Sequence, residues 1–225
     1  SFAVINVLEE ALPQYDYEIL FIDNCSTDGT RAELEKLCAP GVVVDLSDQA
    51  EDWGIYTAED IEKRVEVKEG DILIINTGYH KYGFDQPEAD ERRYMLRHPG
   101  PSLDFIQWVR EKKLKWIGVD CGSADHPMNT KIRDWEPMEA EKCNQVMLER
   151  YGKSLNELYP WPEHYQAMHF ELFTQPYEAI HAECLGGDID KLSNKRVVIG
   201  CFPWKFVDGE SCISRIVAFD GFDNA

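Results

Sequence analysis

Residues 68–80 read KEGDILIINTGYH, and this stretch decides the class of fold that the sequence favours. A polar turn at residues 68–70 leads into the nearly continuous apolar run DILII at residues 71–75. A strand with one face in water alternates apolar and polar residues, whereas an unbroken apolar run is typical of a strand covered on both faces. The stretch therefore predicts a central strand of a sheet.

The rest of the chain supplies further strands and helices around this one. Short apolar runs predict strands at residues 17–23, 42–46, 114–119, 196–202 and 212–219. Capping signals and apolar spacing predict helices at residues 30–38, 57–64, 103–112 (capped by Ser102) and 137–151. Breaker residues predict an interruption at 39–41, a long loop at 79–101 and a hairpin turn at Asp208-Gly209. The alternation predicts an α/β fold with a mixed sheet.

The net charge and the cysteine pattern indicate which binding partners and which cellular compartment to expect. Lys+Arg number 23 against 42 Asp+Glu, which gives a net charge of -19. Nucleic acids and anionic membranes bind basic surfaces, so we expect neither as a partner. Seven dispersed cysteines without a CxxC pair favour free thiols in a reducing, cytoplasmic compartment. No glycine-rich phosphate loop and no G-x-S-x-G turn is present.

Histidines and carboxylates gather late in the chain. Residues 181–183 read HAE, which puts His181 and Glu183 on one side of an extended segment, and His169 lies twelve residues upstream. Imidazole nitrogen together with carboxylate oxygen suits zinc or manganese. Spacing of this kind also occurs among ordinary surface and core histidines, so both interpretations stay open at this point.

A polar loop, DCGSADHP at residues 120–127, follows the strand predicted at 114–119. Asp125 and His126 in this loop suit orientation of a ligand or acid–base catalysis, because α/β folds place their chemistry just past strand ends. The alternative is a structural turn in which Asp120 accepts hydrogen bonds from backbone amides.

From about residue 41 to residue 220 the chain resembles the cyclase family of metal-dependent hydrolases, which includes bacterial kynurenine formamidases and isatin hydrolases. The stretches that carry the resemblance are GVVVDLSD (41–48), VKEGDILIINTGYHKYG (67–83), HPGP (98–101), IGVDCGSADHPMN (117–129), Met168-His169, IHAECLGGDID (180–190) and VVIGCFPWKFVDGESC (197–212). The resemblance implies a fold of the swivelling β/β/α type, a homo-oligomer, a zinc or manganese ion, and a small-molecule substrate: a small amide, lactam or lactone that a metal-activated water hydrolyses.

The resemblance also implies roles for individual residues. His169 matches the later metal-site histidine of the family, and Glu183 matches the acidic position of its I-x-E-N-L-like segment, although Cys184 follows here instead of Asn. We assign His169 and Glu183 to the metal, and we assign three residues to substrate binding: Asp125, His126 and His181.

One family motif is missing from the sequence. The main metal motif, H-x-G-T-H-x-D-x-P-x-H, is expected well upstream of Val42 and includes the catalytic histidine, but the first histidine of this chain is His80. No catalytic residue is therefore assigned. An open catalytic zinc site normally has three protein ligands and we recognise two, so a non-catalytic, oligomerising domain is an alternative function.

The N-terminal segment resembles a different family. Residues 18–34 read EILFIDNCSTDGTRAEL, which looks like the nucleotide-binding strand and loop of family-two glycosyltransferases, with Asp23 and Asp28 at its acidic positions. We therefore divide the chain into residues 1–39, a glycosyltransferase-like segment, and residues 40–225, an N-terminally incomplete hydrolase domain. Two alternatives remain: a nucleotide-sugar glycosyltransferase, and a segment 1–39 that simply completes the sheet.

Overall fold

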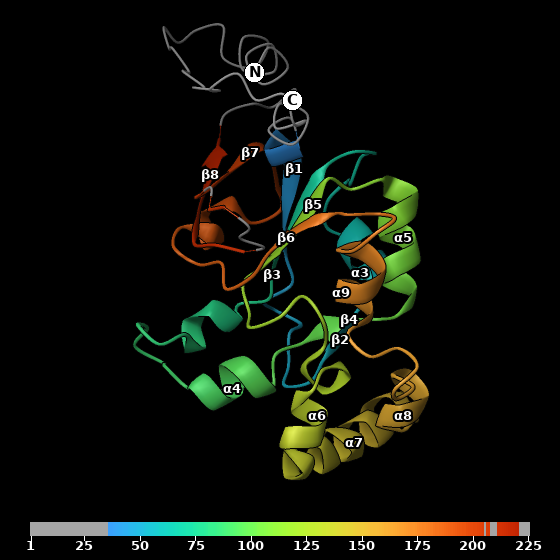
Figure 1. Cartoon of the computed structure of the whole chain (residues 1–225). Helices are drawn as coiled ribbons and strands as arrows, with labels where there is room; N and C mark the ends of the chain where they lie inside the picture. Colours follow the sequence, from blue (N-terminus) through green and yellow to red (C-terminus); the bar gives the residue numbers. More distant parts are fainter. Residues whose placement is uncertain (1–35, 205, 208–210, 221–225) are drawn as a thin grey trace, which may run out of the picture.

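The structure is a computed structural model of the 225-residue chain, and it describes residues 36–204, 206–207 and 211–220 (Figure 1). The strand, loop and helix expected over residues 17–38 lie almost entirely outside the described residues, as does the Asp208-Gly209 turn.

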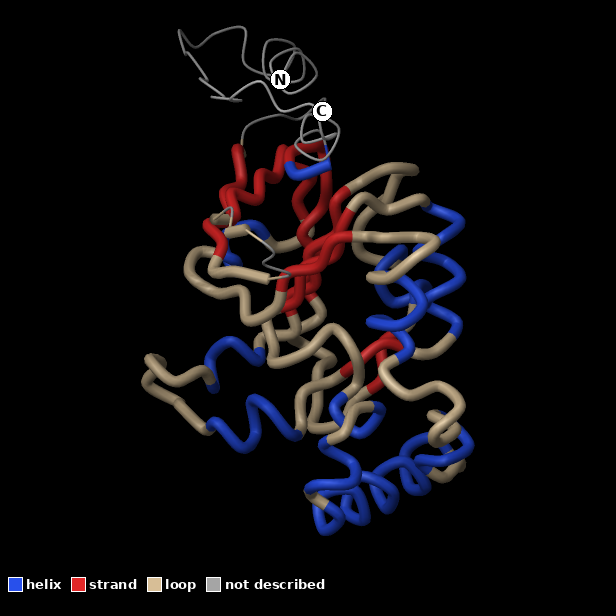
Figure 2. Tube along the Cα trace, viewed as in Figure 1, coloured by secondary structure: helices blue, strands red, loops and turns tan. Residues whose placement is uncertain are grey.

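A six-stranded mixed sheet forms the centre of the molecule, in the order β6-β5-β3-β1-β7-β8 (Figures 1 and 2). Four neighbouring strands run parallel, and β7 and β8 pair antiparallel to complete the sheet. The mixed α/β class predicted from the sequence is thus confirmed. The strands are β1 (Cys38–Asp45), β3 (Ile72–Asn76), β5 (Trp116–Val119), β6 (Ile180–Ala182), β7 (Lys195–Pro203) and β8 (Ser214–Phe219).

Strand β1 begins earlier than predicted. Residues 39–41, expected to break structure, belong to β1, so that prediction is wrong. Antiparallel pairing with β7 begins at Cys38, whereas parallel pairing with β3 begins only at Gly41. Pro40, which lacks an N–H, therefore lies where β1 has a neighbour on one side only, a position that proline tolerates in sheets.

The pleat of the central strands divides their side chains between two cores. Val42 and Val44 of β1 face one core, and Val43 faces the other. Strand β3 alternates in the same way, and all five of its residues are buried. This explains why residues 71–75 read as a continuous apolar run: both faces of the sheet are covered.

Helices α3 (Ala58–Glu62), α5 (Asp104–Lys112) and α9 (Ala167–Leu172) lie together on one face of the sheet (Figure 1). The predicted capping box of α3 is confirmed, because Thr57 and Asp60 exchange both hydrogen bonds. Ser102 does not cap α5; Leu103 occupies that position without a side-chain hydrogen bond. The opposite face is covered by the 3-10 helix η3 (Ile189–Leu192) and neighbouring loops.

A third apolar cluster lies beyond the edge of the sheet. It is built on α7 (Pro137–Tyr151), which ends at Gly152 with a φ of 66°, as the sequence predicted. Three further helices contribute to this cluster: the 3-10 helix η2 (Pro127–Asn129), α6 (Ile132–Trp135) and α8 (Leu155–Leu158).

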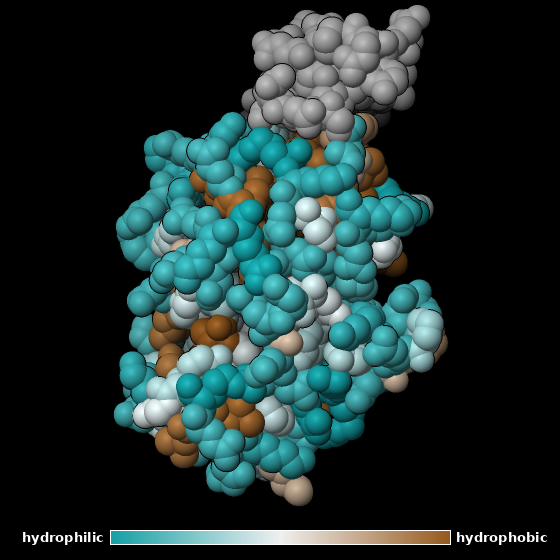
Figure 3. Space-filling view, turned by 180° about the vertical axis from the view of Figure 1, so that it is seen from behind, coloured by the Kyte–Doolittle hydropathy of each residue, from teal (hydrophilic) through white to brown (hydrophobic). Residues whose placement is uncertain are grey.

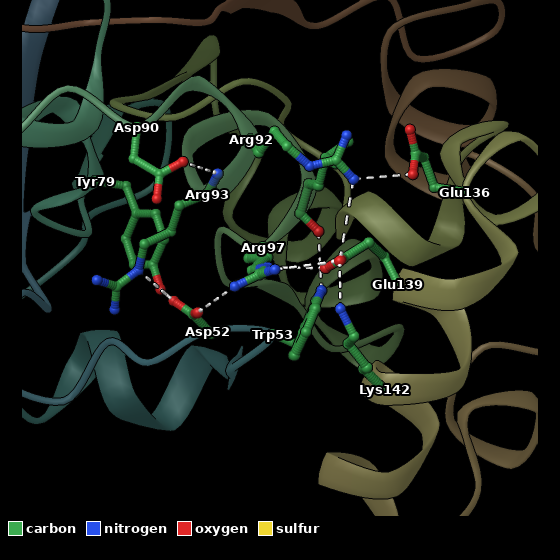
Figure 4. A network of polar contacts seen from close by, with 11 residues as sticks. Asp52, Trp53, Tyr79, Asp90, Arg92, Arg93, Arg97, Glu136, Glu139 and Lys142 are labelled. Atoms are coloured by element: carbon green, nitrogen blue, oxygen red, sulfur yellow. Dashed lines mark hydrogen bonds and ion pairs between the residues drawn. The ribbon is translucent and has the colours of Figure 1, made fainter.

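Residues 79–101 contain regular structure, so the predicted long loop is wrong over much of its length. The segment holds η1 (Tyr79–Tyr82), α4 (Glu91–Leu96), capped by Asp90, and β4 (Gly100–Pro101), which pairs with β2 (Ile55–Tyr56). Figure 4 shows what fixes it: Arg93 contacts Asp52 at 2.7 Å and Arg97 contacts Glu139 of α7 at 2.8 Å. Contacts made across the fold, rather than local apolar spacing, hold α4 in place.

The face of the molecule seen in Figure 3 is largely hydrophilic and carries separate hydrophobic patches. The most exposed apolar side chains of the hairpin formed by β7 and β8 are Trp204, Phe206, Val207 and Ile213. The six cysteines among the described residues are free thiols. Within the same residues, no helix combines the length and apolar character needed to cross a bilayer.

Gly41 is the position in the central strands where an added side chain would have the least room. A Cβ atom at residue 41 would lie 2.3 Å from the carbonyl oxygen of Ile72 and 2.9 Å from Cδ1 of Ile199. We expect Gly41→Ala to lower the free energy of unfolding by about 1–3 kcal/mol, because a packed core has no room for the methyl group. Urea denaturation measures this. Gly186→Ala is the matched control, since its Cβ would meet nothing nearer than 4.0 Å; equal losses in the two variants would contradict the prediction.

Candidate metal centre

Two buried carboxylates occupy the loop that follows β5. The Asp120 side chain is fully buried and Asp125 is 1% exposed. Strand β5 is parallel to its neighbours β3 and β6, so the segments that leave all three strands meet at one edge of the sheet. Each carboxylate hydrogen-bonds to a histidine supplied by another segment.

Asp125 fixes the position and orientation of His169. Its carboxylate accepts the backbone N–H of Met168 at 2.9 Å and of His169 at 3.3 Å, the second and third residues of α9. It thus supplies, from a distant segment, the side-chain acceptor that the N-cap residue Gln166 does not provide. The same carboxylate lies 2.7 Å from Nδ1 of His169, which leaves Nε2 free to point elsewhere.

Nε2 of His169 points at Glu183, whose Oε1 lies 3.6 Å away. The backbone N–H of Ala124 donates to that same oxygen at 2.8 Å. One short loop therefore orients both groups: Asp125 holds the imidazole, and the adjacent amide holds the carboxylate.

His181 completes the cluster. Ile180 and Ala182 pack into the core opposite α9, so the pleat of β6 directs His181 and Glu183 to the α9 side of the sheet. The imidazole of His181 stacks on Phe173, with 4.1 Å between ring centroids and an interplanar angle of 8°. Ligand atoms of His169, His181 and Glu183 lie within 4.8 Å of one another, the one such group of three among the described residues.

The pKa values of the two histidines of the cluster shift in opposite directions. Burial lowers the pKa of His169, but the hydrogen bond and charge of Asp125, with the charge of Glu183, outweigh it, and the net pKa is raised. Burial and repulsion by His169 lower the pKa of His181 to about 4. His181 is therefore a neutral imidazole at pH 7, the form that binds metals.

The donor set fits a divalent metal ion. Two imidazole nitrogens and one carboxylate oxygen are the donors that zinc accepts in sites with three protein ligands, and manganese also accepts them. The side chains of His169 and Glu183 are 28% and 26% exposed, so a small molecule can reach the cluster. The hydrogen bond that the remaining nitrogen of His169 donates to Asp125 is the support that metal-ligating histidines usually have.

A second histidine is held in the same way by Asp120. Nδ1 of His80 lies 2.9 Å from Asp120, and its Nε2 lies 3.2 Å from Asp190. Asp120 also accepts the backbone N–H of Thr77 at 2.8 Å. Asp120 thus accepts backbone amides, as the structural interpretation of the loop predicted, and it also orients an imidazole.

The other residues proposed from the sequence lie in different surroundings. His126 is 1% exposed, its ring stacks on Tyr159, and its Nδ1 accepts the N–H of Met128. The structure therefore places His126 in the core, whereas Asp125 holds His169 and His181 lies beside His169 and Glu183. Asp23 and Asp28 lie outside the described residues.

Sequence reasoning did not connect His80 to Asp120. A usable signal was present: His80 lies four residues after β3, and Asp120 directly follows β5, which pairs with β3. The carboxyl ends of adjacent parallel strands meet, so the two side chains were candidates for contact.

One family model matches the chain. The family model Cyclase, described as "Putative cyclase", matches residues 13–126. No curated protein sequence matches the chain.

Solved structures match over most of this chain. An isatin hydrolase bound to the product analogue thioisatinate aligns with a TM-score of 0.55 at 20% identity, covering 82% of this chain and 61% of its own. Isatin hydrolase A from Ralstonia solanacearum aligns with a TM-score of 0.57 at 19% identity, covering 90% and 65% respectively. The chain spans less than two thirds of the length of either. These matches confirm the cyclase-like hydrolase fold that the sequence resemblance implied.

Replacement of Asp125 tests whether one carboxylate organises the cluster. We expect Asp125→Asn to lower the free energy of unfolding by about 1–3 kcal/mol, because an amide group replaces a buried charged acceptor that serves three donors. Asp134→Asn is the control: its exposed ion pair with Lys131 should contribute less than about 1 kcal/mol. Urea denaturation of both variants checks this, and a smaller loss at 125 than at 134 would contradict it.

The buried His126 predicts a loss of stability in acid. Burial and repulsion by His98 lower the pKa of His126 to about 3, whereas the unfolded value is near 6.5. Below pH 6.5 the unfolded chain binds a proton that the folded chain excludes. The free energy of unfolding therefore falls by about 1.4 kcal/mol for each pH unit of acidification. His126→Asn keeps an acceptor for the N–H of Met128 and removes this titration.

We therefore expect the stability advantage of the wild-type chain over His126→Asn to shrink by about 2 kcal/mol between pH 7 and pH 5. Thermal or urea denaturation at both pH values provides the comparison. Met128→Leu, a buried substitution without a titrating group, should show a pH-independent difference. A constant difference for His126→Asn would show that the folded chain accepts the proton.

Proposed function

Because the chain belongs to the Cyclase family, whose model matches residues 13–126, we propose that it is a metal-dependent hydrolase of a small amide, lactam or lactone. Family membership confirms the resemblance read from residues 41–220. The observation that carries the proposal is the convergence of His169, His181 and Glu183 within 4.8 Å. The two ligands recognised in the sequence thus gain a third, the number typical of open catalytic zinc sites.

Each side chain of the site has a distinct role in this proposal. His169, through Nε2, and His181 and Glu183 would hold zinc or manganese. The ion supplies Lewis-acid chemistry, which polarises a carbonyl group and lowers the pKa of a coordinated water. Asp125 keeps Nδ1 of His169 protonated and its ring fixed, and the N–H of Ala124 keeps Glu183 turned toward the histidines. Phe173, stacked on His181, limits the rotation of that ring.

The substrate class rests on the fold and on the chemistry of the site. The structure of similar fold that holds thioisatinate is an isatin hydrolase, so a cyclic amide of this kind is the first substrate to test. N-formylkynurenine, a linear amide, is the second, from the resemblance to kynurenine formamidases. The carbonyl carbon is the atom attacked in both.

Metal binding and hydrolysis test the proposal together. We expect the purified chain to bind one equivalent of zinc or manganese and to hydrolyse isatin or N-formylkynurenine. Loss of a supporting hydrogen bond typically lowers metal affinity about 10–100-fold, and we expect His169→Ala, His181→Ala and Glu183→Gln each to exceed this. Isothermal titration and metal analysis measure the affinity.

The control for these variants is His164→Ala, an exposed histidine whose Nδ1 lies 3.8 Å from Glu171. It should bind metal like the wild-type chain. A wild-type chain that binds no divalent metal would contradict the metal site. A chain that binds metal and hydrolyses neither amide would contradict the substrate class.

A further inference from the structure

We infer that the proton on Nε2 of His80 fastens the segment of residues 186–194 to the sheet, so that this segment loosens when the proton leaves. The bridge lies on the face of the sheet opposite to His169, His181 and Glu183. It controls the attachment of a segment and not a chemical step at the metal, so the inference goes beyond the proposed function and stands without it.

The bridge joins the carboxyl ends of β3 and β5 to η3. Val119 of β5 packs into the core on the helix side of the sheet, so the alternation of side chains directs Asp120 to the side of η3. Asn76, at the end of β3, points to the same side, and its Nδ2 donates to Asp190 of η3 at 2.8 Å. His80 lies between the two carboxylates and contacts both.

Each ring nitrogen of His80 faces a carboxylate. Nδ1 lies 2.9 Å from Oδ2 of Asp120, and Nε2 lies 3.2 Å from Oδ2 of Asp190. An ionised carboxylate can only accept hydrogen bonds, so each contact needs a proton on the ring nitrogen. Both hydrogen bonds therefore exist together only in the imidazolium form, and a neutral ring must give up one of them.

Burial decides which hydrogen bond is lost. Asp120 is fully buried, and its Oδ1 accepts the N–H and the hydroxyl of Thr77 at 2.8 and 2.7 Å. The Asp190 side chain is 67% exposed, so water can replace His80 there, whereas a buried carboxylate that loses a donor stays unsatisfied. The neutral ring therefore keeps its proton on Nδ1, and the lone pair of Nε2 is turned toward the negative charge of Asp190.

Few other contacts fasten this segment. Ile189 is its one buried residue. The hydroxyl of Ser193 donates to Asp45 at 2.6 Å, and the backbone N–H of Asp45 donates to Oδ1 of Asn194 at 3.0 Å. The contacts of Asp190 with Asn76 and His80 are the remaining polar attachment at η3. A segment with so small an apolar anchor has a low local stability, so one hydrogen bond changes how often it opens.

The charges around His80 keep the bridge closed at neutral pH. The hydrogen bond to Asp120 raises the pKa of His80, burial opposes this, and the charges of Asp120 and Asp190 act in the same direction as the hydrogen bond. Hydrogen bonds from neighbouring serines outweigh burial and lower the pKa of Asp45, so that carboxylate stays charged as the bridge opens.

The other ionisable groups near the bridge stay neutral or are paired elsewhere. Burial raises the pKa of the Tyr94 phenol and of the Cys121 thiol, so both stay neutral near the buried carboxylate. Lys191 of η3 pairs with Asp188 at 2.8 Å, and Lys81 of η1 lies over an aromatic ring of its own helix. The proton on His80 is therefore the one that switches the attachment.

Amide hydrogen exchange of the full wild-type chain tests the attachment. The N–H of Asp45 is the reporter, because its acceptor is the side chain of Asn194. A raised pKa means that the stabilisation is complete below about pH 6.5 and is lost as pH rises through the pKa of His80. We expect the protection factor of this amide, corrected for the intrinsic rate, to fall about threefold to tenfold over that range. The amides of β3 should keep theirs.

Two matched variants of the same segment identify the group responsible. In Asp190→Asn the pH dependence should disappear, because a carboxamide can accept from a ring N–H and can also donate to a bare ring nitrogen. Asp188→Asn removes an exposed carboxylate that pairs with Lys191 and does not contact His80, so it should keep the wild-type pH dependence. Equal pH dependence in Asp190→Asn and the wild-type chain would overturn the inference.

Nuclear magnetic resonance of the wild-type chain locates the proton itself. We expect both ring nitrogens of His80 to carry protons below a midpoint that lies above about 6.5, and Nδ1 alone to carry one above it. A midpoint at or below that value would overturn the inference, and so would a neutral ring protonated on Nε2. A protection factor of Asp45 that changes less than twofold across the titration would also overturn it. Neither measurement requires a metal or a substrate, so the result is separate from that of the proposed function.

Discussion

The burial of two carboxylates in one loop is the constraint on which the candidate site depends. A buried carboxylate must be fully hydrogen-bonded, and Asp120 and Asp125 meet this requirement with backbone amides and one imidazole each. These hydrogen bonds hold two histidines from distant parts of the chain at the same edge of the sheet. His80 and His169 are therefore oriented by the electrostatics of the loop at residues 120–125 rather than by their own segments.

The sheet makes this arrangement possible. Strands β3, β5 and β6 are adjacent and parallel, so His80, the loop at residues 120–125 and Glu183 all leave the sheet at one edge. Antiparallel β7 and β8 complete the other side without contributing to the cluster. The close approach at Gly41 shows how tightly the strands that support this edge are packed.

Local sequence patterns predicted the elements that local physics determines. The apolar runs of β3 and β5, the capping box at Thr57 and the end of α7 at Gly152 follow from burial, side-chain hydrogen bonds and glycine backbone freedom. The predictions failed where distant contacts decide. Residues 39–41 extend β1 because β7 pairs with them, and α4 forms where ion pairs from other segments hold it.

The sequence by itself determined the α/β class, the family resemblance and the candidate ligands His169 and Glu183, because apolar periodicity and short motifs are local. Only the tertiary structure decided what those residues meet. It placed His181 beside His169 and Glu183, buried His126 in the core, and set His80 against Asp120. The physical reason is that coordination and hydrogen bonding depend on distances of a few ångströms between atoms. In this chain those atoms lie forty or more residues apart in sequence for both Asp–His pairs, so strand pairing across the sheet sets the distances.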